Sequence, residues 1–241
     1  MRIFLAGANG TIGRRLTPLL IAAGHVVTGT TRAAVKVEEL KGLGAEAVVV
    51  DVFDAAALRN AVLLARPEVV MHQLTDLPDV FDPARLSEVL ARNSRLRIEG
   101  TANLIAAAQA AGARRLIAQG LAFAYADGPE PHAETDALAP EQGDTPSAIT
   151  ARGVRALEKA VLHAPGIDGI VLRYGRLYGP GTWNTPHARA PLHVDAAAQA
   201  ALLAVTRGVP GVYNIAEDDG AVTIDKARKE LGFDPAFRLA S

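Results

Sequence analysis

The stretch that decides the fold of this chain is Ile3-Phe4-Leu5-Ala6-Gly7-Ala8-Asn9-Gly10-Thr11-Ile12-Gly13. Its first four residues are apolar, as in a short strand buried within a parallel sheet. Three glycines then follow at a spacing of three, and apolar residues recur at helical spacing from Leu16 to Ala23. A strand therefore enters a glycine-rich turn, and a helix leaves that turn.

Each glycine of this turn has a physical role in holding a dinucleotide. Gly7 permits the tight turn, Gly10 lets a pyrophosphate approach the backbone, and Gly13 lets the helix pack closely on the strand. The helix N-terminus adds free N–H groups and a positive dipole end. The alternative is a glycine-rich turn in an α/β protein that binds nothing, but the strand and helix around the turn favour binding. The cofactor-binding residues predicted here are Gly7, Asn9, Gly10, Thr11, Ile12 and Gly13.

The second predicted strand, residues 26–31, ends in Thr30-Thr31-Arg32. In an NAD-binding unit an acidic residue near this point binds the ribose 2′-hydroxyl. No acid is present here, whereas Arg32 can pair with a 2′-phosphate and Thr31 can hydrogen-bond to it. The sequence therefore predicts NADP as the preferred cofactor and leaves NAD open, because Arg32 could also be an ordinary solvated loop residue.

Composition excludes several other classes of function. The 241 residues carry 25 Lys and Arg against 26 Asp and Glu, so neither a nucleic acid nor an anionic membrane is expected as a partner. Cysteine is absent, and no apolar run approaches the roughly 18 residues of a membrane span. The first residues lead directly into a strand, so no signal peptide is expected and the predicted location is cytoplasmic.

Strands and helices alternate along the rest of the chain, which predicts an α/β fold, a Rossmann-type doubly wound parallel sheet. Residues 1–172 would form the dinucleotide-binding core and residues 173–241 a small, reduced C-terminal substrate lobe. Residues 127–146 lack periodicity, and a loop of that length is usually functional or mobile. Further strands are expected at 47–50, 68–71, 114–118, 167–172 and 212–215, and helices at 38–44, 55–65, 82–111, 147–164, 194–206 and 223–231.

Several later segments complete a familiar order of landmarks: Asp51-Val52, Met71-His72-Gln73-Leu74, Gly100-Thr101-Ala102-Asn103-Leu104, and residues 172–181, Leu-Arg-Tyr-Gly-Arg-Leu-Tyr-Gly-Pro-Gly. With these segments the chain resembles the extended short-chain dehydrogenase/reductase superfamily, of the NAD-dependent epimerase/dehydratase type. The resemblance implies a small-molecule substrate and a homodimer formed through helices 83–111 and 147–163. It also implies that Asp51 and Val52 meet the adenine and that Gln73, Leu74 and Arg173 line the cleft.

The chain departs from this superfamily at the catalytic positions. The family's Ser or Thr after the fifth strand falls on Leu121, and its Tyr-x-x-x-Lys pair falls on Thr150 and Val154. No tyrosine in the chain has a lysine four residues later. The usual proton relay is therefore expected to be absent.

Three other residues are candidates for catalysis. Tyr125 follows the fifth strand and is either a substitute acid or a buried tyrosine with a satisfied hydroxyl. His132 can exchange protons near neutral pH, although a lone loop histidine is usually solvated. Thr150 could only position a substrate. No metal site is predicted, because His193 and Asp195 lack a suitably spaced third ligand.

Two functions remain open from the sequence. The first is an NADP-preferring oxidoreductase or epimerase-like enzyme that acts on a small carbonyl or sugar-like substrate without the Tyr-Lys relay. The second is a non-catalytic dinucleotide sensor or partner-binding protein, which Leu121 and Val154 favour. We favour the enzyme, because a dinucleotide cradle beside a groove usually serves chemistry.

Overall fold

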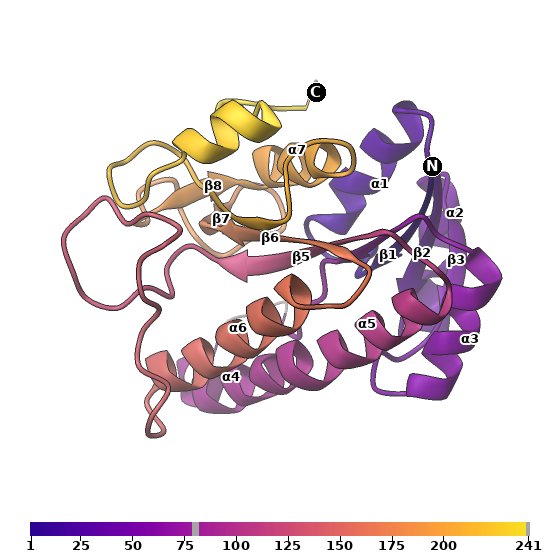
Figure 1. Cartoon of the computed structure of the whole chain (residues 1–241), viewed down its shortest axis with the longest axis horizontal. Coiled ribbons are helices and arrows are strands. Elements are labelled where there is room, and N and C mark those ends of the chain that lie inside the picture. The colour runs from indigo at the N-terminus through magenta and orange to yellow at the C-terminus, as the bar shows by residue number, and fades with distance from the viewer. Residues whose placement is uncertain (79–81, 240–241) are drawn as a thin grey trace.

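Seven parallel strands form the main sheet of the computed structural model, which describes residues 1–78 and 82–239. Their order is β3-β2-β1-β4-β5-β6-β9 (Figure 1). The winding reverses between β1 and β4, and a doubly wound sheet binds ligands at such a reversal, beside the carboxyl ends of its strands. The predicted fold class is confirmed. The strands are β1 (Arg2–Ala6), β2 (Val26–Thr31), β3 (Glu46–Val49), β4 (Val69–His72), β5 (Arg115–Leu121), β6 (Asp168–Tyr174) and β9 (Gly211–Ile215).

Helices cover both faces of this sheet (Figure 1). On one face α1 (Gly13–Ala22) packs against α7 (Val194–Ala204). On the other face α3 (Ala55–Ala65) packs against α5 (Thr101–Ala110), and α4 (Leu86–Arg95) packs against α6 (Pro146–Leu162). The short α2 (Val37–Gly42) lies beside β3. No helix in the described ranges has the length and apolar character that crossing a membrane requires.

The side chains of β1 show why its sequence is continuously apolar. Ile3 and Leu5 belong to the hydrophobic core under α1 and α7, whereas Phe4 and Ala6 belong to the core under α3 and α5. Because successive side chains of a strand point to opposite faces, a strand covered on both sides must be apolar at every position. The strand therefore holds the glycine turn on a rigid base.

The long helix expected over 82–111 is divided in the structure. A 3₁₀ turn (Pro83–Arg85) leads into α4, and a π-helical turn (Leu96–Gly100) separates α4 from α5. A Cβ atom on Gly100 would lie 3.1 Å from the Val52 side chain, so the helix passes very close to the segment after β3. Helix α3 agrees with its predicted bounds, and the Asp54 side chain caps it by accepting from the Ala57 N–H at 3.0 Å.

The C-terminal part contains more regular structure than expected. Two short strands that the sequence analysis did not predict, β7 (Arg176–Tyr178) and β8 (Pro191–His193), pair in parallel. The last strand, β9, pairs with β6 and completes the main sheet. The predicted boundary at residue 172 therefore falls within β6. A π-helical turn (Ala227–Leu231) ends at Gly232, whose φ of 74° is typical of a glycine after a helix.

Candidate functional site

A cleft of about 880 Å³ opens at the carboxyl ends of β1 and β4. Its walls are the glycine turn, the ends of β2 and β4, and residues 180–184 after β7. Nine of the predicted cofactor residues line this cleft: Gly7, Asn9, Gly10, Thr11, Thr31, Arg32, Val52, Gln73 and Leu74.

The geometry of the turn explains its glycines. Gly7 has a φ of +91°, and a Cβ atom there would lie 2.5 Å from the Gln73 carbonyl oxygen. A Cβ atom on Gly13 would lie 2.6 Å from the Ala8 carbonyl oxygen, so the start of α1 is in contact with the turn backbone. At Gly10 the nearest atom would be 3.2 Å away, and this residue lines the cleft. The tight turn and the close helix packing predicted from the sequence are therefore present.

The start of α1 presents backbone donors without acceptors. The N–H groups of Thr11, Ile12 and Gly13 make no hydrogen bond to any part of the chain that the structure describes. Unpaired N–H groups at a helix N-terminus, together with its dipole, favour a bound anion such as a pyrophosphate. The side chain of Ile12 is buried in the core, so Ile12 and Gly13 can serve a cofactor only through their backbone.

Gln73 is the clearest sign that the cleft is built for a ligand. Its side chain is 4% exposed and lines the cleft, and its amide atoms make no hydrogen bond of good geometry among the described residues, although the buried Tyr174 hydroxyl lies near enough to interact with it. Leaving buried polar atoms unpaired costs about 1–3 kcal/mol for each group. A dinucleotide offers hydroxyl and amide groups that would satisfy both atoms. The glycine turn, the helix N-terminus and Gln73 therefore fit such a cofactor.

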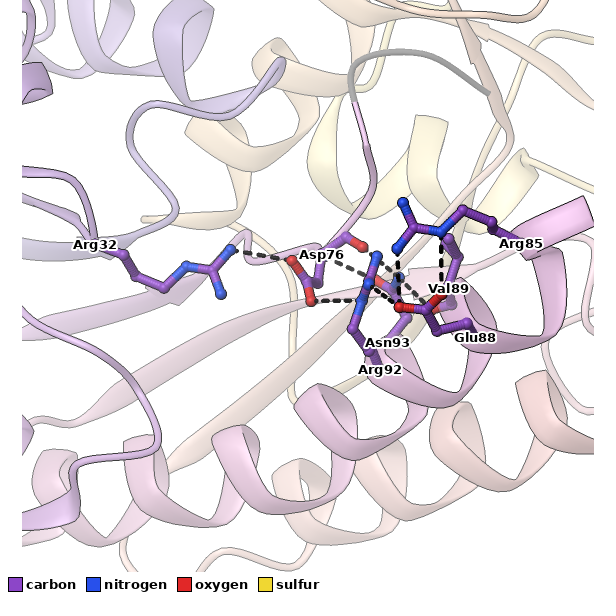
Figure 2. Close-up of polar contacts among 7 residues, drawn as sticks. All are labelled: Arg32, Asp76, Arg85, Glu88, Val89, Arg92 and Asn93. Carbon is purple, nitrogen blue, oxygen red and sulfur yellow. Dashed lines mark hydrogen bonds and ion pairs between the residues drawn. The ribbon is translucent and has the colours of Figure 1, made fainter. Parts of the chain in front are cut away.

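Arg32 lines the cleft, and its guanidinium forms an ion pair with Asp76 (Figure 2). Its Nη2 atom is 3.0 Å from Oδ1 of Asp76, and the other oxygen of Asp76 is 3.1 Å from Nε of Arg92. The buried side chain of Asn93 holds the backbone of Asp76, whose N–H donates to Asn93 Oδ1 at 2.9 Å. Asp76 therefore stands between two guanidinium groups, and the sequence analysis did not identify it. Asp76 lies four residues after β4, the strand next to the reversal of the sheet. That position in the sequence could have indicated a residue of the cleft.

Two predicted cofactor residues lie elsewhere. Asp51 is exposed and outside the cleft lining, because its Oδ1 accepts from the Phe53 N–H at 2.9 Å and forms a local turn. Arg173 is 4% exposed and binds Glu158 through two hydrogen bonds, Nε to Oε1 at 2.7 Å and Nη2 to Oε2 at 2.8 Å. Burial opposes the charge of Arg173, but the hydrogen bonds and charge of Glu158 outweigh burial and raise its pKa. The expectation that Arg173 lines the cofactor cleft is corrected by this buried pair.

Tyr125 belongs to the same buried network. Its hydroxyl donates to Asn214 Oδ1 at 2.6 Å and accepts from Nη1 of Arg173 at 2.8 Å. Burial raises the pKa of the phenol, against the opposing effect of Arg173. A phenol engaged in this way has the contacts expected of a satisfied core tyrosine. Its role as a substitute acid stays a prediction.

His132 is not the solvated loop residue of the sequence alternative. It is 9% exposed, stacks on Tyr125 with ring centroids 4.8 Å apart, and places Nδ1 at 3.3 Å from Asp136. Tyr125 and His132 both line a second cavity of about 530 Å³ rather than the large cleft. Thr150 is half-buried on α6 and lines neither cavity. The three predicted catalytic residues therefore do not meet at one point.

Two of the three positions to which the sequence analysis assigned the family's catalytic residues, Leu121 and Val154, lie in apolar packing. Leu121 and Val154 share one buried hydrophobic cluster with Ala124 and Leu138, and Tyr125 packs against it. Val154 is fully buried. A serine hydroxyl and a lysine would need polar partners at these positions, and this cluster of aliphatic side chains provides none.

Comparison with known proteins places the chain among nucleotide-cofactor enzymes. The sequence model of the NAD dependent epimerase/dehydratase family matches residues 3–194. A 3-diazoavenalumate denitrifying reductase from a Streptomyces species is 41% identical over 92% of this chain and 77% of its own length.

Solved structures with low sequence identity share the fold. UDP-glucose 4-epimerase of Thermotoga maritima, solved with UDP-glucose, superposes with a TM-score of 0.79 at 20% identity, over 99% of this chain and 94% of its own. A yeast methylglyoxal/isovaleraldehyde reductase complexed with NADPH superposes with a TM-score of 0.76 at 15% identity, over 97% of this chain and 94% of its own.

Proposed function

Because the chain belongs to the NAD dependent epimerase/dehydratase family, we propose that this NAD(P)-dependent enzyme is an NADP-preferring reductase of a small carbonyl compound. The observation that carries the proposal is the cleft at the β1–β4 reversal, with Arg32 rather than an acid at the end of β2. The relative named as a reductase supports a reduction over an epimerisation.

The residues of the cleft have distinct parts in this proposal. The N–H groups at the start of α1 would hold the pyrophosphate, Arg32 and Thr31 the 2′-phosphate, and Gln73 a polar group of the nicotinamide half. A bound NADPH supplies a hydride to an electrophilic carbon, and a proton from solvent completes the two-electron reduction. The proposal routes no proton through a Tyr-Lys pair, because no tyrosine of the sequence has a lysine four residues later and because Leu121 and Val154 lie in an apolar cluster.

That apolar cluster also favours a second candidate function. A dinucleotide sensor or partner-binding protein would keep the cleft and would need no proton donor beside it. The two functions differ in turnover, because only the reductase consumes NADPH when carbonyl substrates are added.

Cofactor preference is tested by titrating NADPH and NADH against the wild type and Arg32→Asp, by calorimetry or cofactor fluorescence. We expect NADPH to bind the wild type about tenfold or more tightly than NADH, since a charge-assisted hydrogen bond contributes roughly 1.5–3 kcal/mol. Arg32→Asp should reverse the preference. The control is Arg114→Asp, an exposed arginine beyond the amino end of β5, which should change neither affinity. Equal affinities, or tighter NADH, in the wild type would refute the NADP preference.

A screen of aldehydes and ketones with NADPH then separates the two functions. Oxidation of NADPH that depends on both enzyme and carbonyl compound supports the reductase. Tight binding of NADPH without oxidation across the screen favours the sensor.

A further inference from the structure

The second cavity lies next to the cofactor cleft but shares none of its lining residues. It is formed by the segment after β5, by Arg176 of β7, by Arg189 and Ala190, and by Ala221 and Val222. Arg176 and Leu177 are successive residues of one strand, and Arg176 lines this cavity while Leu177 lines the cleft. Because successive side chains of a strand point to opposite sides, β7 borders both the cofactor cleft and this cavity.

Arg176 is the unusual side chain of this cavity. Its guanidinium lies 4.3 Å above the centre of the Phe123 ring, and the residue is half-buried. Within residues 1–78 and 82–239 the only recorded contact of its guanidinium is this ring, and no hydrogen bond or ion pair contributes to its pKa. Burial without a compensating acid lowers its pKa. Stacking occupies the face of a guanidinium and leaves the N–H groups along its edge free to donate.

The other charges of the cavity limit which anion can bind. Arg189 contacts Glu130, so those two charges compensate each other. Asp127 also lines the cavity and is exposed at its rim. The guanidinium of Arg176 thus lacks an acidic partner, while the carboxylate of Asp127 lines the same cavity. A single carboxylate matches the two-pronged edge of a guanidinium, whereas a doubly charged phosphate would be repelled by Asp127.

We propose that this cavity binds the carboxylate of a small organic acid and that Arg176 is its anchoring residue. The assignment of that acid as the substrate rests on the proposed function, because the cavity adjoins the cofactor cleft. It predicts a substrate with one negative charge and disfavours one that carries a diphosphate. The walls beside the guanidinium include Phe123, Tyr125 and His132, which suit a flat or apolar body attached to the acid.

The test uses benzoate and cinnamate as probes, with the full chain, by calorimetry or by ligand-observed NMR. Both acids should bind the wild type, and benzamide, which has the shape of benzoate without its charge, should not. Arg176→Gln should weaken acid binding about tenfold to a hundredfold, the range expected from losing charge-assisted hydrogen bonds. Arg176→Lys keeps the charge without the planar edge and should lie between the wild type and Arg176→Gln.

Two controls keep this test separate from the test of cofactor binding. Arg114→Gln, which removes an exposed arginine from the other end of the sheet, should leave acid binding unchanged. Arg176→Gln should bind NADPH as the wild type does, because Arg176 does not line the cleft. A wild-type protein that binds benzoate but does not bind NADPH would refute the proposed function and leave the acid site standing.

Several outcomes would overturn the acid site. These are no binding of either acid to the wild type, unchanged binding to Arg176→Gln, or mutual exclusion of benzoate and NADPH. Tighter binding of phenyl phosphate than of benzoate would also overturn it, because the charge argument requires a monoanion.

Discussion

Arg32 and Asp76 come from separate walls of the cleft, the end of β2 and the segment after β4, and their side chains meet at its mouth with Nη2 and Oδ1 3.0 Å apart. In Figure 2 the guanidinium of Arg32 points to the carboxylate of Asp76, and a 2′-phosphate bound as proposed would need the same guanidinium. Asp76 is therefore a competitor for the group that is proposed to select NADP, and Arg92 on α4 holds it in place at 3.1 Å.

The first prediction follows from this competition. Asp76→Asn keeps the shape of the side chain and removes the charge, so NADPH should bind about two- to fivefold more tightly, consistent with the small energies of exposed ion pairs. NADH affinity should change little. Titration of both cofactors at low and high salt checks this, and the gain should shrink at high salt. Asp168→Asn, at the exposed amino end of β6, is the matched control. An equal gain for NADH would show that Asp76 does not face the 2′ position.

The second prediction separates two glycines of the turn. Gly13→Ala would force a methyl group against the Ala8 carbonyl oxygen and should cost on the order of 1–3 kcal/mol in unfolding free energy. Gly10→Ala has a nearest contact of 3.2 Å, so it should fold with a smaller loss but weaken NADPH binding at least tenfold by displacing the pyrophosphate.

Denaturant unfolding and cofactor titration of the two variants distinguish these effects. Gly42→Ala in α2, where nothing lies within 4 Å of the added methyl group, should leave NADPH affinity unchanged and should not lower the unfolding free energy. If Gly10→Ala bound NADPH as tightly as the wild type, the pyrophosphate would not cross the turn at that residue.

The third prediction concerns the buried pair of Arg173 and Glu158. Arg173→Met leaves the Glu158 carboxylate buried without a partner, which should cost about 3–5 kcal/mol. The double variant Arg173→Met/Glu158→Leu removes both charges and should recover most of that loss. Arg95→Met, which breaks an exposed ion pair with Glu99, should cost below about 1 kcal/mol. Urea unfolding of the three variants measures these free energies. A double variant as unstable as Arg173→Met would show that the unpaired Glu158 carboxylate is not the cause of the loss.

The fourth prediction concerns pH. Burial, and secondarily the charge of Arg97, lower the pKa of His72 to about 4 from a usual value of 6.5. Its neutral form is also required by its contacts, because Nδ1 accepts from the Leu74 N–H at 3.3 Å and Nε2 lies 3.1 Å from Thr101 Oγ1. Below pH 6.5 His72 binds a proton in the unfolded chain, whereas in the folded chain it stays neutral down to about pH 4. The contribution of His72 to the unfolding free energy is therefore complete above pH 6.5. It decreases by about 3 kcal/mol as the pH falls from 6.5 to about 4.

The measurement is the unfolding free energy of the wild type and His72→Gln from pH 7 to pH 4. The variant should be less stable at pH 7 but should lose about 3 kcal/mol less on acidification. His163→Gln, at an exposed histidine, should keep the pH dependence of the wild type. Identical slopes for His72→Gln and the wild type would show that His72 titrates in the folded chain as it does in the unfolded one.

The local features of the fold were predictable from the sequence, and the distant pairings were not. The Asp54 cap and the close packing of Gly13 on the turn depend on neighbours within a few residues, so the sequence spacing predicts them. Arg32 was identified by the absence of an acid beside it, but its partner Asp76 is 44 residues away. Arg173 was misplaced for the same reason, since only the packing of α6 on the sheet brings Glu158 to it. The π-helical turn before α5 likewise reflects contact with Val52, which no helical periodicity reveals.

The strand β7 has a thermodynamic consequence for the two cavities. It is three residues long, and neighbouring positions on it border different cavities, Arg176 the smaller one and Leu177 the larger. Any displacement of this strand by one ligand alters the walls that receive the other. Thermodynamic linkage makes this effect reciprocal. If the first ligand changes the affinity for the second by some factor, the second changes the affinity for the first by the same factor. A strand of three residues would thus couple the affinities of two ligands on this protein, whichever of them binds first.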